Sequence, residues 1–200
     1  MLTHFPIRVQ PAVAALWAVD EAMAAAIAGA SQPALAGIKL AWWREALCRL
    51  DVDLAPPEPR LRAVAQELLP LGVTGTEVAG IEEGWTALLE EQVEASAVAL
   101  RGQRLFAILA RLLGGEDSRL FDAGALFALS DAMRRGRGDF ATERSALIGS
   151  LAGSRSPRRL RPVTLATRLA ARDLAEPEGT PGRALALIGH RLTGVITGGR

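Results

Sequence analysis

The amino-acid sequence predicts an all-α fold, a single-domain bundle of helices. Half of the 200 residues are hydrophobic, but only 4% are aromatic and tyrosine is absent, so Ala, Leu, Val and Ile must build the core. Alanine and leucine favour helices, and apolar residues recur at spacings of three and four rather than two. A chain of this length suits one domain, here residues 1–200.

The first two helices are expected on either side of a short break near Gly29. The first runs from Pro11 to Ala28, because proline is tolerated in an opening turn and Gly29 can end the helix. Ser31 can cap the second helix. One face of this second helix is apolar and is expected to pack inward: Ala36, Leu40, Trp43, Leu47 and Leu50.

Shorter helices are expected in the middle of the chain. A proline-rich connection over residues 51–59 precedes a helix over residues 60–69. Thr74 and Glu77 have the spacing of a capping box, in which each side chain accepts a hydrogen bond from the other residue's backbone amide. A helix is therefore expected from there to about Glu90.

The second half of the chain is expected to hold further helices, over residues 91–113, 118–135, 142–151 and 158–174. Pro162 indicates that the last of these begins later than Arg158, because proline fits only the opening turn. A final amphipathic helix is predicted from apolar residues spaced by three and four: Leu185, Ile188, Leu192 and Ile196.

Charge and cysteine content argue against several functional classes. Lys and Arg number 23 against 22 Asp and Glu, so the net charge of +1 predicts no nucleic-acid partner. The single Cys48 cannot form an internal disulfide, which indicates a reducing compartment. His4 and His190 lack neighbours at zinc-ligand spacing. No apolar run reaches the roughly 20 residues of a membrane span, so we expect a cytoplasmic protein, with peripheral contact to the inner membrane as a further option.

Two motifs near the N-terminus carry a family resemblance. Ala15-Leu-Trp-Ala-Val19 resembles the Ala-Leu-Tyr-Ala-Phe turn of squalene and phytoene synthases, and Leu40-Ala-Trp-Trp-Arg-Glu-Ala-Leu47 resembles their Leu-x-x-Trp-Arg-x-x-Leu pattern. Weaker similarity continues over residues 105–114, 124–135 and 156–174. The resemblance implies a shortened helical bundle of the isoprenoid (terpenoid) synthase type.

The resemblance also implies where catalytic carboxylates should stand. These enzymes hold prenyl diphosphates through Mg²⁺ ions bound by two acidic motifs, since magnesium requires oxygen ligands. Alanines replace the aspartates of the first motif: Ala24, Ala25 and Ala28. The second motif, Gln-x-x-Asn-x-x-Arg-Asp in the family, is also degenerate: Ala128, Asp131, Arg134 and Arg135. We therefore expect no catalytic residue, metal ligand or cofactor in this chain.

The resemblance to a short, degenerate branch implies a non-enzymatic binding or assembly role. That branch is similar to the phytoene-synthase-like assembly factor of respiratory complex I, so the implied partner is a protein client or an isoprenoid ligand. One alternative is an active prenyltransferase that condenses two prenyl diphosphates head to head, using Mg²⁺ or arginines to bind them. A second alternative is a helical interaction module without a cavity.

Six residues are candidates for ligand binding, each with a plainer interpretation: Asp20, Glu21, Trp42, Asp131, Arg134 and Arg135. Asp20 and Glu21 resemble a relic metal site, but an acidic pair in an alanine-rich helix is more simply its solvent face. Trp43 falls at a core position, whereas Trp42 points elsewhere and is a candidate to line a prenyl tunnel. Arginines can bind a diphosphate or anionic lipid, although solvated arginine is the default: Arg134, Arg135, Arg137, Arg155, Arg158, Arg159 and Arg161.

Overall fold

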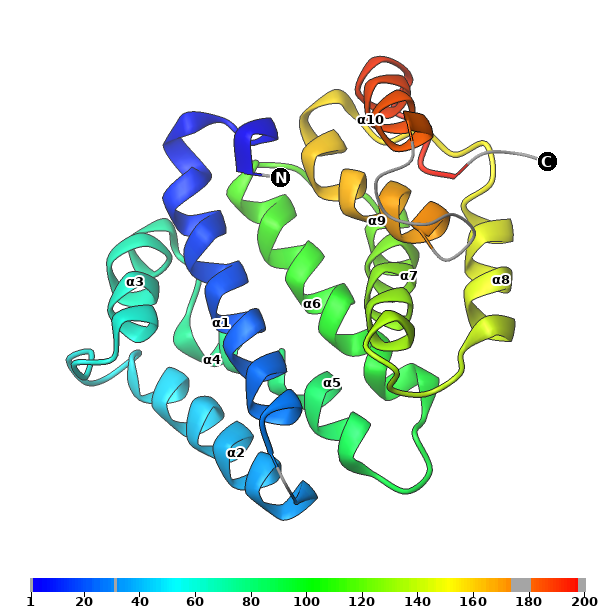
Figure 1. Cartoon of the computed structure of the whole chain (residues 1–200). Helices are drawn as coiled ribbons and strands as arrows, with labels where there is room; N and C mark the ends of the chain where they lie inside the picture. The colour runs from blue at the N-terminus through cyan, green and yellow to red at the C-terminus, as the bar shows by residue number, and fades with distance from the viewer. Residues whose placement is uncertain (1, 31, 174–180, 198–200) are drawn as a thin grey trace. The chain divides into compact units, whose positions relative to one another are not determined.

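The computed structural model describes residues 2–30, 32–173 and 181–197, and these residues form helices and isolated bridges but no strand (Figure 1). The all-α prediction is confirmed. The specific isoprenoid-synthase fold stays a prediction. The helices fall into two compact units, which we name the N-terminal unit (residues 2–93) and the C-terminal unit (from residue 94 onward).

The N-terminal unit is arranged around its first helix. Its α-helices are α1 (Gln10–Ala28), α2 (Pro33–Arg49), α3 (Pro59–Glu67), α4 (Gly75–Ala79) and α5 (Glu82–Thr86). Helix α1 packs against α2, α3 and α5, and α2 also packs against α4. Pro11 lies in the first turn of α1 and Gly29 caps its C-terminus, as the sequence predicts.

Helix α2 has two apolar faces. The predicted inward face is confirmed, because all five of its residues are buried: Ala36, Leu40, Trp43, Leu47 and Leu50. A second row of apolar side chains, Leu35, Ile38 and Trp42, is exposed on another face of the helix. We call these three residues the α2 apolar row. Their spacing of three and four brings them onto one stripe.

The connections around α4 are fixed by local hydrogen bonds. The capping box is confirmed, since Glu77 N donates to Thr74 Oγ1 (3.1 Å) and Thr74 N donates to Glu77 Oε2 (2.7 Å). Asp51 also accepts from the Gly75 amide (2.6 Å). The expectation of one helix to Glu90 is wrong, because α4 ends at Ala79 and α5 is followed by a 3₁₀ turn. Gly80, a residue of low helix propensity, caps the C-terminus of α4.

The C-terminal unit contains α6 (Ala95–Leu112), α7 (Arg119–Arg134), α8 (Ala141–Ser150), α9 (Arg161–Asp173) and α10 (Pro181–Thr193). Helix α7 packs against α6, α8 and α9, and α9 packs against α10. Helix α9 begins at Arg161, after a 3₁₀ turn, so the later start indicated by Pro162 is confirmed.

The backbones of α6 and α7 touch where two glycines face each other. A Cβ atom added to Gly102 would lie 2.6 Å from the carbonyl carbon of Gly124 and closer still to its oxygen. A Cβ atom added to Gly124 would lie 2.6 Å from the carbonyl carbon of Gly102. The absence of side chains at these two positions allows the helices to approach this closely.

Helix α10 is amphipathic, but its large apolar side chains do not form its packed face. Leu185, Ile188 and Leu192 are 70%, 56% and 73% exposed. The buried side of the helix instead carries Ala186 and His190. His190 can be buried because both ring nitrogens have hydrogen-bond partners, including the Val195 carbonyl at 2.8 Å from Nδ1. The predicted final helix is present, but it ends at Thr193, and the buried Ile196 lies beyond it.

Candidate functional site

Three of the candidate residues meet on α7 around one buried carboxylate. Asp131 Oδ1 accepts a hydrogen bond from Arg134 Nη2 (2.9 Å), and Asp131 Oδ2 accepts one from Arg135 Nε (3.0 Å). The spacings of three and four residues place these arginines beside Asp131 on the helix surface. A third guanidinium comes from α6, since Arg101 Nη1 donates to Asp131 Oδ2 (2.8 Å). We call these four residues the Asp131 cluster.

Arg101 is the member of the Asp131 cluster that sequence reasoning missed. It is only 1% exposed, and its guanidinium carbon lies 5.5 Å from the centre of the Phe127 ring. Phe127 in turn stacks on Phe106. An arginine among the apolar residues of α6 was the available signal, because a buried cation requires an anionic partner. The sequence alone does not indicate which acidic residue is that partner.

The arginines determine the protonation of Asp131. Burial alone would raise the pKa of the Asp131 carboxyl, but Coulombic attraction to Arg101, Arg135 and Arg134 outweighs burial. The pKa of Asp131 therefore lies below its ordinary value, and the carboxylate is ionised at neutral pH. Both of its oxygens serve as acceptors for cationic side chains, so Asp131 is a structural anion of the α6–α7 contact.

The positions of the first degenerate motif lie near the C-terminal end of α1. Ala24 is buried at 2% exposure, whereas Ala25 and Ala28 are exposed. The interpretation of Asp20 as a solvent-face residue is wrong, because its carboxylate is buried and accepts a hydrogen bond from Trp85 Nε1 on α5 (2.9 Å). Glu21 is exposed, as expected. No sequence spacing linked Asp20 to Trp85, which lies 65 residues away.

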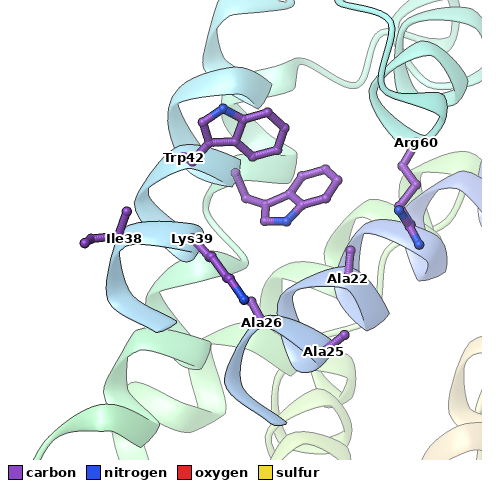
Figure 2. A pocket seen from close by; sticks show the side chains of 8 residues that line it. Ala22, Ala25, Ala26, Ile38, Lys39, Trp42 and Arg60 are labelled. Atoms are coloured by element: carbon purple, nitrogen blue, oxygen red, sulfur yellow. The ribbon is translucent and has the colours of Figure 1, made fainter. Parts of the chain in front are cut away.

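An open groove lies between α1, α2 and α3, and we call it the α1–α2 groove (Figure 2). Its cavity volume is about 580 Å³, within the range of small-molecule sites. It is lined by small and aromatic side chains with two cations at the sides: Ala22, Ala25, Ala26, Ile38, Lys39, Trp42, Trp43 and Arg60. Figure 2 shows Lys39 extending from α2 toward Ala26 on α1.

Trp42 gives the α1–α2 groove an aromatic wall. This side chain is 48% exposed and packs edge-to-face on the buried Trp43, with ring centroids 5.2 Å apart. The prediction that Trp43 belongs to the core is confirmed. Trp42 belongs to the Leu40–Leu47 motif and Ala25 to the positions compared with the first acidic motif, and both line the same groove.

The described residues offer little for metal or nucleophilic chemistry. Over residues 2–30, 32–173 and 181–197, no group of three or more His, Cys, Asp or Glu side chains is placed to hold a metal ion. Cys48 is half-buried and forms no disulfide. The pKa of His190 is lowered by burial, and its ring nitrogens contact the hydroxyl of Thr164 and two backbone carbonyls.

One helical stretch among the described residues, Ile7–Ala28, is long and apolar enough to cross a membrane, and 61% of its most apolar window is buried within the structure. Core helices of soluble proteins and signal sequences share this length and composition, so the stretch carries no argument about localisation. No family model, curated protein or solved structure matches the chain. The family resemblance therefore rests on the sequence motifs alone.

Proposed function

We propose that this chain is a non-enzymatic binding or assembly protein, similar to squalene and phytoene synthases but without their chemistry. The observation that carries the proposal is the Asp131 cluster. Both oxygens of Asp131, the acidic residue at the degenerate second motif, accept hydrogen bonds from arginines. A carboxylate used in this way, with three cationic groups beside it, is a poor ligand for Mg²⁺.

The first motif supports the same proposal. Magnesium bound to a diphosphate needs protein oxygen ligands, and methyl groups stand at Ala24, Ala25 and Ala28. Asp20, the nearest buried carboxylate in sequence, accepts a hydrogen bond from Trp85. A single relic carboxylate would not replace a motif of several aspartates.

The α1–α2 groove favours a ligand-binding protein over a helical module without a cavity. Its alanine floor and the Trp42 ring offer apolar surface, so the ligand class that suits it is an isoprenoid or similar apolar chain. The protein-client form of the proposal, assembly of respiratory complex I, rests on the sequence resemblance. For both the ligand-binding form and the protein-client form, we expect the protein not to convert prenyl diphosphates.

The catalytic part of the proposal is tested with farnesyl and geranylgeranyl diphosphate in the presence of Mg²⁺. We expect no release of diphosphate above the protein-free background and no hydrocarbon product, while a squalene synthase assayed in parallel gives both. Magnesium-dependent release that disappears in the variant Arg134→Ala/Arg135→Ala would contradict the proposal. It would instead support the head-to-head prenyltransferase with arginine-bound diphosphate.

The binding part is tested by tryptophan fluorescence during titration with a prenyl alcohol, which carries the chain without the diphosphate. We expect quenching that Trp42→Phe largely removes. Ala25→Leu fills the groove and is expected to weaken binding at least about fivefold, because added methylenes collide with a bound chain. Ala28→Leu is the matched control, since Ala28 is exposed on α1 but does not line the groove. If Ala25→Leu and Ala28→Leu weakened binding equally, the α1–α2 groove would not be the binding site.

A further inference from the structure

Helix α10 presents a row of aliphatic side chains to solvent. Leu185, Ile188 and Leu192 are each more than half exposed. Their spacing of three and four places them on one stripe along the helix. We call these residues the α10 apolar row. Single exposed leucines are ordinary, but three in line on one helix form a continuous apolar surface.

The rest of the C-terminal unit holds this row in place. On the opposite side of α10, Ala186 and His190 are buried. Arg161, at the start of α9, donates from Nη1 to the carbonyls of Arg191 (2.7 Å) and Leu192 (3.0 Å), which caps the last turn of α10. The segment after α10 then pairs with the loop before α9, since Ser156 N donates to Gly194 O (2.8 Å). The α10 apolar row is therefore displayed by a fixed helix.

Arginine outnumbers acidic residues in the sequence around α10. No Asp or Glu occurs from Arg144 to Arg172 or from Pro181 to Thr197, and Asp173, Glu176 and Glu178 lie between these two ranges, although the whole chain is nearly neutral. Arg155, Arg158 and Arg191 are exposed in this region. Among the described residues their side chains form no hydrogen bond or ion pair. We call these three residues the C-terminal arginines.

Two of the C-terminal arginines, Arg155 and Arg191, lie at the end of α10. Arg155 forms an antiparallel bridge with Val195, which follows the helix. Arg191 lies on α10 itself, between Ile188 and Leu192 in sequence, and flanks the apolar row on the helix surface. Exposed aliphatic side chains and exposed cations that form no ion pair among the described residues therefore occur together at the end of α10.

We propose that α10 docks on the surface of an anionic lipid membrane. The α10 apolar row would enter the boundary between head groups and acyl chains, and the C-terminal arginines would contact lipid phosphates. Basic amphipathic helices bind membranes by adding apolar burial to electrostatic attraction. Three aliphatic side chains bury far less than the roughly 800 Å² per partner of a stable protein interface, so the row fits a lipid surface better than a protein partner. This inference is independent of the proposed function.

The test uses the full chain and sedimentation with vesicles of phosphatidylcholine, with or without phosphatidylglycerol. We expect binding to the anionic vesicles that weakens as salt is raised, and little binding to the neutral ones. Leu185→Ser/Ile188→Ser/Leu192→Ser is expected to lose binding at least about tenfold. Arg155→Gln/Arg158→Gln/Arg191→Gln is expected to weaken binding on the order of 100-fold, because each cation near an anionic surface contributes about fivefold.

The matched control replaces exposed apolar residues elsewhere, in the variant Val52→Ser/Leu54→Ser in the connection after α2, outside the α1–α2 groove. It is expected to bind anionic vesicles like the wild type. All three variants change exposed side chains, and circular dichroism checks that they remain folded. The proposal is overturned by equal binding to neutral and anionic vesicles, by no binding to either, or by an equal loss in the Val52→Ser/Leu54→Ser control. Self-association in the absence of lipid that the serine variant abolishes would also overturn it, because a second copy would then cover the row.

Discussion

Asp131→Asn is expected to lower the free energy of unfolding of the C-terminal unit by about 3 to 5 kcal/mol at neutral pH, the usual cost of breaking a buried ion pair. The substitution keeps the shape of the side chain but removes the charge that lies 2.8 Å from the guanidinium of Arg101. Since Arg101 is 1% exposed, water cannot replace the lost carboxylate. Urea unfolding followed by circular dichroism measures the change.

Arg134→Gln is the matched control for this prediction. It removes a more exposed partner of the same carboxylate, at 2.9 Å, and leaves the pair between Asp131 and Arg101 in place. We expect a loss of no more than about 1 kcal/mol, because water screens an exposed ion pair. If the two variants unfold with the same free energy, the buried pair is not an important source of stability for this unit.

The Asp131→Asn effect should depend on pH with a defined sign. The pKa of Asp131 in the folded protein lies below its ordinary value, because the three arginines outweigh burial. A lowered folded pKa gives stability that is fully present above the unfolded pKa of about 3.9 and is lost as the pH falls toward the folded pKa. The difference between wild type and variant is therefore expected to stay constant at mildly acidic pH and to shrink below about pH 4.

Gly102→Ala is expected to destabilise the C-terminal unit by about 2 to 3 kcal/mol, the cost of overpacking a core. In an ordinary helix this exchange stabilises by up to about 1 kcal/mol, so the prediction reverses the usual sign. The new Cβ would collide with the carbonyl group of Gly124 and lie 3.0 Å from the Cβ of Ala128. The collision can be relieved only if α6 and α7 move apart, because the atoms that the new Cβ meets belong mostly to the backbone of α7.

Gly149→Ala in α8 provides the comparison for Gly102→Ala. A Cβ atom at Gly149 would meet nothing within 4 Å, so this variant is expected to be neutral or slightly more stable. Thermal unfolding of both variants gives the comparison. A Gly102→Ala variant as stable as Gly149→Ala would show that the close approach of α6 and α7 is not required for folding.

Sequence patterns predicted those structural features that depend on residues close together in the chain. The buried face of α2 followed from apolar spacing, and the cap of α4 followed from the three-residue separation of Thr74 and Glu77. The grouping of Arg134 and Arg135 beside Asp131 also follows from helical spacing. In each case the residues lie on one helix or at its end.

The contacts that sequence reasoning missed join residues distant in the chain. Arg101 reaches Asp131 across 30 residues, and Trp85 reaches Asp20 across 65. No periodicity encodes such pairs, because they depend on how helices pack. The sequence pattern also did not indicate which face of α10 packs: His190 is polar, yet its hydrogen bonds allow it to be buried while Leu185 and Leu192 are exposed.

The burial of Ala24 determines what a designed carboxylate at this end of α1 would require. The alanine is only 2% exposed. A single Ala24→Asp exchange would bring an unpaired charge into a dry interior, at a cost that threatens folding. An acidic group can therefore be accommodated here only together with a cation or with a change that opens the space beside α1 to water.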